Sequence, residues 1–502
     1  MPNPPELLDH RGHRITELDI QKSMRTNIIA GVLGMTWAGM ALNYALTLFM
    51  EAIGASGVMI GLLLTVRQVV IAVQVPAALY FESLPEHLGS RKRWWAIPSL
   101  AHRLAWFAVG GLALCWKPGA GWLPFTVVVV VGVSELLAQT GAPLWFSWMA
   151  DLIPHKTGGQ FWGRRQSIVT LGALSGMAAA GFLLDAFRVP ATGKTSALGF
   201  ALVFTLAAAF GVSDILLHLK VKEPRRAPIA PGGSVVEKLL APLRNHDFLR
   251  FTLCMGAFYA AISVYSPFSI VYLKRDFPVT YSHIAALSIA GSLGAVLTGF
   301  SVGKRVDRLG PRVLAALLIL MTPCTALIWF FVQPTLVTLQ LPGFGAWIVP
   351  QVILIQLVAS FIAGAAVSAM FPCQVRLAAL LSNNAGRTMA MGVHWAIIGL
   401  LASLGSMLGG SIMDWFKAHP LHYIFPTGTS FSFLHVSIGV FALLLWGGCL
   451  PLILSIRTPV DKVPFGKAVS WIVQPFNVVR SLASLRWPQE AEEEKEDAQT
   501  RR

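Results

Sequence analysis

The chain has 502 residues, of which 55% are hydrophobic and only 13% are charged, and its formal net charge is +15. A soluble domain carries about 25% charged residues, so this composition excludes an ordinary soluble protein and indicates a membrane protein. The five cysteines lie in or beside apolar segments without a CxxC pair, and we expect neither disulfides nor a metal site.

Apolar runs long enough to cross a bilayer, which takes about 20 residues, recur along almost the whole chain. The chain is therefore predicted to be all-α, a polytopic membrane protein with twelve transmembrane helices in two similar six-helix halves, 27–217 and 248–456. The expected spans are 27–50, 57–82, 94–116, 122–150, 166–187, 197–217, 248–273, 281–302, 313–333, 347–371, 388–416 and 432–456.

The positive charge is concentrated on one side of the predicted membrane. If the tail at 1–26 is cytoplasmic, about 30 Lys and Arg residues fall in the tails and cytoplasmic loops, and about 6 fall in the opposite loops. Positively charged loops stay in the cytoplasm, so we expect a multi-pass protein of the bacterial inner membrane with both termini inside. Because topology accounts for the excess charge, we expect no nucleic-acid partner.

Three charged residues of the first half, Arg67, Arg103 and Glu135, lie inside predicted spans at similar depth. A charge at the bilayer centre costs about 2.5–3.5 kcal/mol, so such residues face the interior or water and usually pair. Gln139 lies one helical turn beyond Glu135 on the same face. One interpretation is a static ion pair that stabilises this half. The other is solute recognition or proton coupling through Glu135, because a carboxyl beside a cation can gain or lose a proton.

Two polar segments flank the second half. Residues 218–247 are basic and then rich in Pro and Gly, which predicts a cytoplasmic linker between the halves. The tail at 457–502 contains an amphipathic pattern at 465–486, which we expect to rest on the inner membrane surface or on the protein's own cytoplasmic face. The acidic end of the tail is predicted to be disordered.

The spans of the second half carry almost no charge and offer neutral polar side chains instead. Each such side chain is most often a helix–helix hydrogen-bonding group. If they line one cavity with the charges of the first half, the cavity would suit a polar organic solute, with an acidic group for one of the arginines. The neutral candidates are Asn43, Tyr259, Ser263, Gln356 and His394.

A short charged segment occurs twice, after the second and the eighth spans. Residues 86–91 (EHLGSR) align with residues 307–312 (DRLGPR). A carboxylate there can face a neighbouring helix N-terminus and stabilise one packing of the two halves, so these loops are the expected conformational gate. The candidate gate residues are Glu86, Gly89, Arg91, Gly303, Asp307, Arg308, Gly310 and Arg312.

The second copy of this segment, G-x3-D-R-x-G-P-R from Gly303 to Arg312, resembles the loop signature of the major facilitator superfamily. The first copy departs from the signature, since Glu82 stands at the glycine position and Glu86-His87 replaces Asp-Arg. Residues 148–165 look like the corresponding segment of some bacterial members. The resemblance implies twelve helices in two halves around a central cavity.

A second repeat lies in the fifth and eleventh spans. Gly176, Gly181 and Asp185 keep the spacing of Gly405, Gly410 and Asp414. Small residues let helices approach closely in lipid. Because both aspartates end their spans, we expect them to act at helix ends rather than to contact solute.

The two halves and the resemblance together predict a secondary active transporter that moves a small polar organic solute by alternating access, coupled to protons. We expect it to act as a monomer in the lipid bilayer. The soluble segments contain no nucleotide-binding motif, so we do not expect an ATP-driven pump. The sequence shows no His/Asp cluster or acidic pair with metal-ligand or acid–base spacing at a membrane face, so we expect no cofactor and no enzyme activity. The alternatives are a sugar–cation symporter driven by sodium or protons, and a non-transporting membrane sensor.

Overall fold

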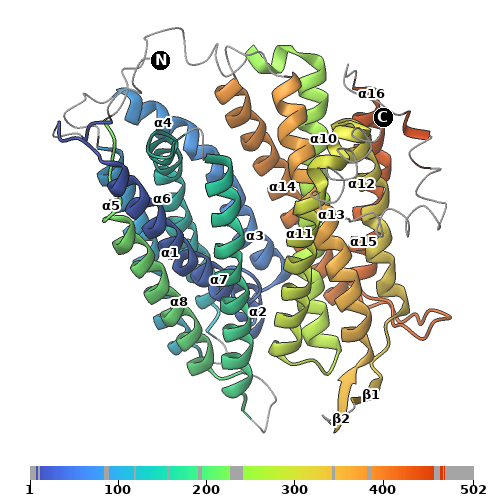
Figure 1. Cartoon of the computed structure of the whole chain (residues 1–502). Coiled ribbons are helices and arrows are strands. Elements are labelled where there is room, and N and C mark those ends of the chain that lie inside the picture. The colour runs from blue at the N-terminus through green and yellow to red at the C-terminus, as the bar shows by residue number, and fades with distance from the viewer. Residues whose placement is uncertain are drawn as a thin grey trace, which may run out of the picture.

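The computed structural model describes residues 7–9, 12–83, 90–117, 120–154, 158–189, 195–225, 241–341, 345–381, 387–456, 464–466 and 469. Within these ranges the chain has twelve helical segments that are long and apolar enough to cross a membrane. They form two bundles side by side, which confirms the predicted fold class (Figure 1).

The first half consists of helices that follow the predicted spans in order. Its elements are α1 (Glu17–Ala41), α2 (Ala45–Ala52), α3 (Gly57–Val69), η1 (Val70–Val73), α4 (Gln74–Ser83), α5 (Arg91–Leu114), α6 (Leu123–Leu152), α7 (Gly158–Ala186) and α8 (Ala197–His218).

The second half adds a short β-hairpin to its helices. Its elements are η3 (Ala241–Arg244), α10 (His246–Asp276), α11 (Tyr281–Leu309), α12 (Pro311–Ala326), η4 (Leu327–Phe331), β1 (Leu336–Leu341), β2 (Gly345–Pro350), α13 (Gln351–Leu381), α14 (Arg387–Ala418), α15 (Phe433–Leu443), the π-helical turn η6 (Leu444–Cys449) and α16 (Leu450–Ser455). The strands pair antiparallel, with Leu336 opposite Pro350. Residues 347–350, predicted as the start of a span, therefore belong to the hairpin.

Two predicted spans are not continuous α-helices. The first is interrupted by a turn at 42–44 between α1 and α2, and the second by the 3₁₀ turn η1 between α3 and α4. Non-helical backbone at membrane depth is tolerated where it is buried in protein or lines a cavity, because its freed polar groups need partners. The breaks therefore point to the interior between the halves.

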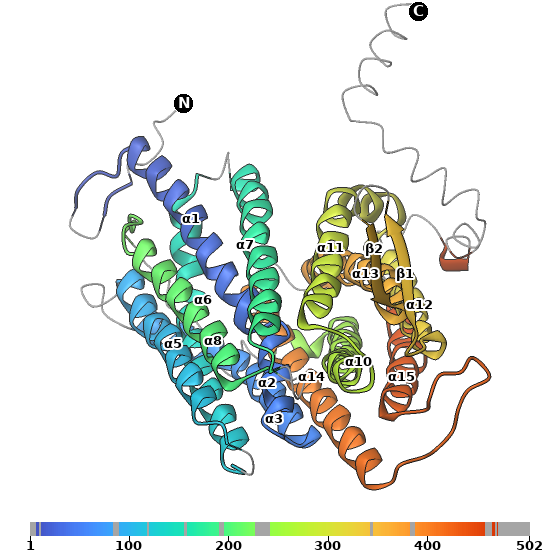
Figure 2. The same cartoon turned by 90° about the horizontal axis from the view of Figure 1, so that it is seen from below.

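The helices of each half have distinct places. Figure 2 shows α5 and α8 at the outer edge of the first half, whereas α3 and α7 face the second half. On the other side, α14 packs on α3 and α11 packs on α7. These two helix pairs make the main contact between the halves.

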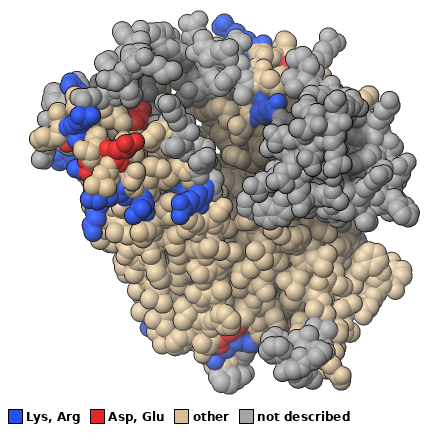
Figure 3. Space-filling view, viewed as in Figure 1, with Lys and Arg blue, Asp and Glu red and all other residues tan. Residues whose placement is uncertain are grey.

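The two ends of the molecule differ in charge. Figure 3 shows Lys and Arg side chains gathered at the end where α1 begins, above a broad uncharged surface. We call this end, at which α1 and α5 begin and α16 ends, the basic end. Toward it the two halves diverge, and toward the opposite end they converge (Figure 1).

Candidate functional site

A cavity of about 370 Å³ lies between the two halves, bounded by α1–α3 on one side and α10–α13 on the other. Its polar wall comes from both halves, with Asn43, Thr47 and Arg67 from the first and Ser266, Ser288, Thr325, Gln356 and Ser360 from the second. Three predicted site residues, Asn43, Arg67 and Gln356, therefore meet at one place.

Arg67 brings the only charge to this lining within the described residues, and it is paired. Its Nε lies 3.2 Å from Oε1 of Glu135 on α6, and the two side chains are 24% and 10% exposed. Beyond this pair, Gln74 at the start of α4 donates to Gln139 of α6 at 2.5 Å. These two contacts join α3 and α4 to α6, and they hold Arg67 at the cavity wall with Glu135 directly behind it.

The two helix breaks lie beside the cavity. Asn43 is in the turn between α1 and α2, and Arg67 lies three residues before η1. On the opposite wall, Pro267 interrupts the hydrogen bonding of α10 next to Ser266. Backbone groups freed at such breaks can bind a solute that side chains only partly surround.

Two aromatic residues of the cavity escaped sequence analysis. The indole N–H of Trp329 in η4 donates to the hydroxyl of Tyr265 on α10, at 2.5 Å, and both residues line the cavity. In the sequence each looks like one of many aromatics in apolar spans. The fold brings them together, with Trp329 in the 3₁₀ turn η4 and Tyr265 on α10 two residues before Pro267.

Arg103 does not join this lining. It donates to Asp214 of α8 at 3.2 Å, and its guanidinium lies 3.5 Å from the ring centroid of Trp37. The same carboxylate lies 2.9 Å from Nδ1 of His218. This second polar network stays inside the first half, between α1, α5 and α8.

The remaining predicted residues of the second half bond to other helices. The Tyr259 hydroxyl donates to Gln374 at 3.1 Å, and His394 lies between Thr252 and Gln374, at 3.0 Å from each. Ser263 accepts a hydrogen bond from Gln68 of α3 at 3.1 Å, which links the two halves. These side chains hold helices together around the cavity and are absent from its lining.

The halves are closed on each other at the end opposite the basic end. Both carboxylate oxygens of Asp414 on α14 accept backbone N–H groups at the start of α3, from Gly57 at 2.6 Å and Val58 at 2.7 Å. Asp185 on α7 does the same at the start of α11, with Tyr281 at 2.9 Å and Ser282 at 2.7 Å. Each aspartate thus caps a helix of the other half, as the sequence predicted for a helix-end role. We call these two contacts the aspartate clamps.

The sequence profile of the Major Facilitator Superfamily matches residues 27–360. The chain belongs to this superfamily. No curated protein sequence matches the chain.

Solved structures of major facilitator transporters share this fold. A mutant form of the nucleoside transporter NupG superposes with a TM-score of 0.64 at 13% identity, over 86% of this chain and 98% of that one. A bacterial homologue of the human lysosomal transporter Spinster, described as inward-facing and unoccupied, gives 0.57 at 15%, over 88% and 95%. A bacterial homologue of the iron transporter ferroportin gives 0.56 at 12%, over 86% and 99%. The protein is thus a membrane transporter of the superfamily, not an enzyme.

The superfamily's loop signature is only partly described in this transporter. Glu86 and Gly89 fall outside the described residues, and for Gly303, Asp307 and Arg308 only the helical backbone of α11 is described. The structure does describe Arg91 and Arg312, the arginines at the ends of the two repeats, and they make equivalent contacts. Arg91 donates to the carbonyl of Pro224 beyond α8 at 2.9 Å, and Arg312 to that of Ile456 beyond α16 at 2.9 Å. Each arginine therefore ties the start of its own helix, α5 or α12, to the end of the last span of its own half.

Proposed function

We propose that this protein is a secondary active transporter that carries a small polar organic solute by alternating access and couples the transport to protons. The observation that carries the proposal is the cavity between the halves, whose wall holds Arg67 with Glu135 directly behind it. Its volume of about 370 Å³ falls at the small end of the roughly 300–1,000 Å³ found for small-molecule sites. The cavity therefore fits a compact solute.

The chemistry of the lining supports a polar solute with a planar or anionic group. Hydroxyl and amide side chains of both halves offer hydrogen bonds, while Trp329 and Tyr265 offer aromatic faces. An acidic group on the solute would compete with Glu135 for Arg67. Losing its partner, Glu135 would then take up a proton, since an isolated carboxylate in the membrane interior is costly. Solute and proton would bind together by this exchange.

The proposal extends to topology. The basic end would face the cytoplasm of a bacterial inner membrane, following the rule that positive loops stay inside. Residues 218–247 would link the halves, 1–26 and 457–502 would be cytoplasmic tails, and the monomer would be the working unit. The clamps then close the outer side in this structure.

Transport assays can test the role of the Arg67–Glu135 pair. A solute is first selected from nucleosides, sugars, amino acids and organic acids by its thermal stabilisation of the purified protein. Uptake into proteoliposomes is then measured with and without a proton gradient, and with a sodium gradient, for Arg67→Gln, Glu135→Gln and the double variant. The more exposed pair Asp247–Arg250, whose side chains are 30% and 50% exposed, provides the matched control as Asp247→Asn with Arg250→Gln.

We expect each single variant to lose about 3 kcal/mol of stability, because it leaves a largely buried charge without its partner. The double variant should regain much of that stability and still fail to accumulate solute in response to the proton gradient. The control should transport like the wild type. Gradient-driven uptake that survives Glu135→Gln would exclude proton coupling through this residue, and sodium-driven sugar uptake would instead favour the symporter alternative.

A further inference from the structure

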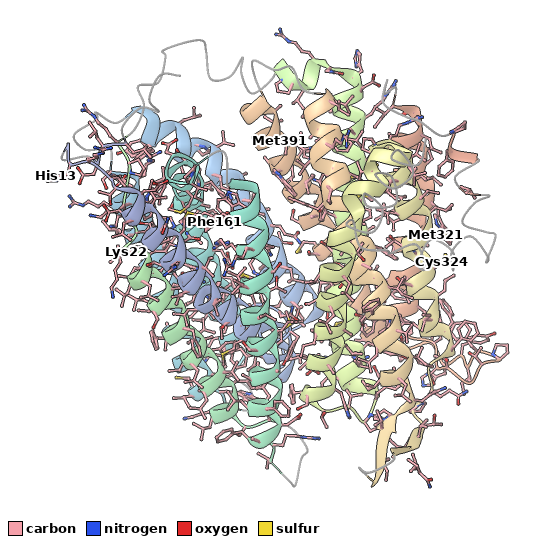
Figure 4. All side chains as sticks on the ribbon, viewed as in Figure 1. His13, Lys22, Phe161, Met321, Cys324 and Met391 are labelled. Carbon is pink, nitrogen blue, oxygen red and sulfur yellow. The ribbon has the colours of Figure 1, made fainter. Side chains whose placement is uncertain are left out.

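A second and larger cavity, of about 690 Å³, lies on the flank of the first half at the basic end. It is bounded by the start of α5, the end of α8 and the N-terminal segment that contains His13. Figure 2 shows α5 and α8 at the outer edge of the molecule, and Figure 4 shows His13 at the same edge, away from the second half. The cavity therefore opens to the surroundings of the protein and takes no part in the central site.

The upper wall of this flank cavity is cationic. Lys92, Arg93 and Lys222 line it, together with the carboxylates of Asp9 and Glu223. The Glu223 carboxylate accepts two hydrogen bonds at the start of α5, from the Ser90 hydroxyl at 2.8 Å and from the Lys92 backbone N–H at 3.3 Å.

Asp9 is engaged within its own segment. It accepts the backbone N–H of His13 at 2.8 Å. Three cationic side chains face two carboxylates in this lining, so the cavity carries a formal excess of one positive charge. The nearby N-terminus of α5, a helix of 24 residues, adds the positive end of its dipole.

The lower wall of the flank cavity is apolar. Ala96, Ile97 and Leu100 contribute from α5, Ile215 contributes from α8, and Leu219 follows directly after α8. Ile97 is 61% exposed and Leu219 is 40% exposed, and in the chain they lie four residues after Arg93 and three before Lys222. Side chains one turn apart extend this wall by about 6 Å along the helices. A free anion would gain nothing from such a wall, whereas a lipid would place its glycerol and first methylene groups there.

We infer that the flank cavity binds an anionic phospholipid, whose headgroup phosphate lies among Lys92, Arg93 and Lys222 and whose chain begins along Ile97 and Leu219. Basic pockets between transmembrane helices at a membrane surface hold such headgroups, because the phosphate meets fixed cations where the acyl chain can remain in the bilayer. Lys92 keeps donors for it, since its ammonium has three and one is used on the Val221 carbonyl at 3.0 Å. The bound lipid would join α5, α8 and the N-terminal segment at one point.

The test measures lipid binding to the full-length protein in detergent, by native mass spectrometry and by the shift in melting temperature. The probes are phosphatidylglycerol, phosphatidylcholine and inorganic phosphate, each added to wild type and to Lys92→Gln with Arg93→Gln. The control is Arg244→Gln with Arg250→Gln, which removes the same charge from exposed positions on η3 and α10 of the second half.

Phosphatidylglycerol should bind and stabilise the wild type and the control, and it should bind about 30-fold more weakly to the Lys92/Arg93 variant, because each cation near the surface contributes about one kcal/mol. A further variant, Ile97→Ser, should weaken the binding of phosphatidylglycerol although it leaves every cationic side chain of the cavity in place. Equal binding of the two lipids, or equal loss in the control, would overturn the inference. Stabilisation by inorganic phosphate that equals the lipid's and is unaffected by Ile97→Ser would show a site for soluble anions instead.

Discussion

Single residues carry the local geometry on which the halves depend. Gly310 joins α11 to α12 with φ of 92° and ψ of 146°, a conformation that is essentially restricted to glycine. The N–H of Gly310 still donates to the Val306 carbonyl at 3.0 Å, and this hydrogen bond restricts the backbone of the turn between the two helices. Glycine at position 310 therefore has a backbone role in this turn.

Replacing Gly310 by alanine should lower the stability of the second half by about 1–3 kcal/mol, through backbone strain alone. The measurement is the unfolding free energy of the purified protein in mixed micelles. Gly439→Ala on α15 is the control, since nothing lies within 4 Å of an added Cβ there and its φ is not positive. Equal stability of the two variants would show that the turn at Gly310 can relax.

Burial of charge is predictable for single residues because physics leaves few choices. Arg67, Arg103 and Glu135 lie at similar depth and unpaired charges there are costly, so the sequence predicted pairing without naming the partners, and the structure pairs Arg67 with Glu135. Arg103 was assigned to the same place, yet it pairs with Asp214 and stacks on Trp37. The depth of a residue follows from hydropathy, but the direction of its side chain depends on the rotation of each helix, which the sequence does not give.

At the level of elements, the glycines of α7 and α14 divide into two repeated roles. Gly176 packs on the backbone of α1 at Thr36, and Gly405 packs on α10 at Ala260, each within its own half. One to two turns further on, Gly181 meets Tyr281 and Ala285 of α11, and Gly410 meets Gly57 of α3, each across the interface. The sequence predicted close packing at all four glycines. It could not show which of them pack within one half and which pack between the two halves.

This division predicts different outcomes for two similar substitutions. Gly176→Val should impair folding, because the side chain would collide with the α1 backbone inside one half. Gly410→Val should leave each half folded and weaken the closed end, because two separate bundles can move apart there. The yield of monodisperse protein reports the first effect, and the rate of solute exchange reports the second. Loss of folding in both variants would contradict the division.

The course of the helices was also only partly predictable. Hydropathy located the spans, because a bilayer demands a minimum apolar length. It did not reveal the turn at 42–44, η1 or the β1–β2 hairpin, whose conformations depend on neighbouring helices. The missed breaks border the cavity, so the parts of the fold nearest to function were the hardest to predict.

For the whole molecule, the internal repeat is visible in three kinds of contact. The arginines at the repeated loops, the paired glycines and the aspartate clamps all recur in both halves with equivalent partners. The charge inside the membrane is not repeated, since Arg67, Glu135, Arg103 and Asp214 all belong to the first half. The repeated contacts therefore build the two similar halves and join them at the closed end, whereas the proposed proton coupling rests on charges that only the first half carries.

In the proposed transport cycle the halves rock about the cavity, and the aspartate clamps hold this structure closed at one end. Spin labels at Arg164 on α7 and Arg250 on α10, both exposed and near the basic end, report the separation of the halves there. Asp185→Asn with Asp414→Asn weakens the clamps, because charge-assisted hydrogen bonds to backbone N–H groups are roughly twice as strong as neutral ones. Asp276→Asn at the same end is the control, since this residue pairs with its neighbour Arg275, outside the interface.

The deciding measurement is the distance distribution between these labels by double electron–electron resonance. The account predicts that the clamp variant shifts the distribution to shorter distances, because the halves part at the clamped end and close at the basic end, while Asp276→Asn behaves like the wild type. A clamp variant with an unchanged distribution would contradict the account.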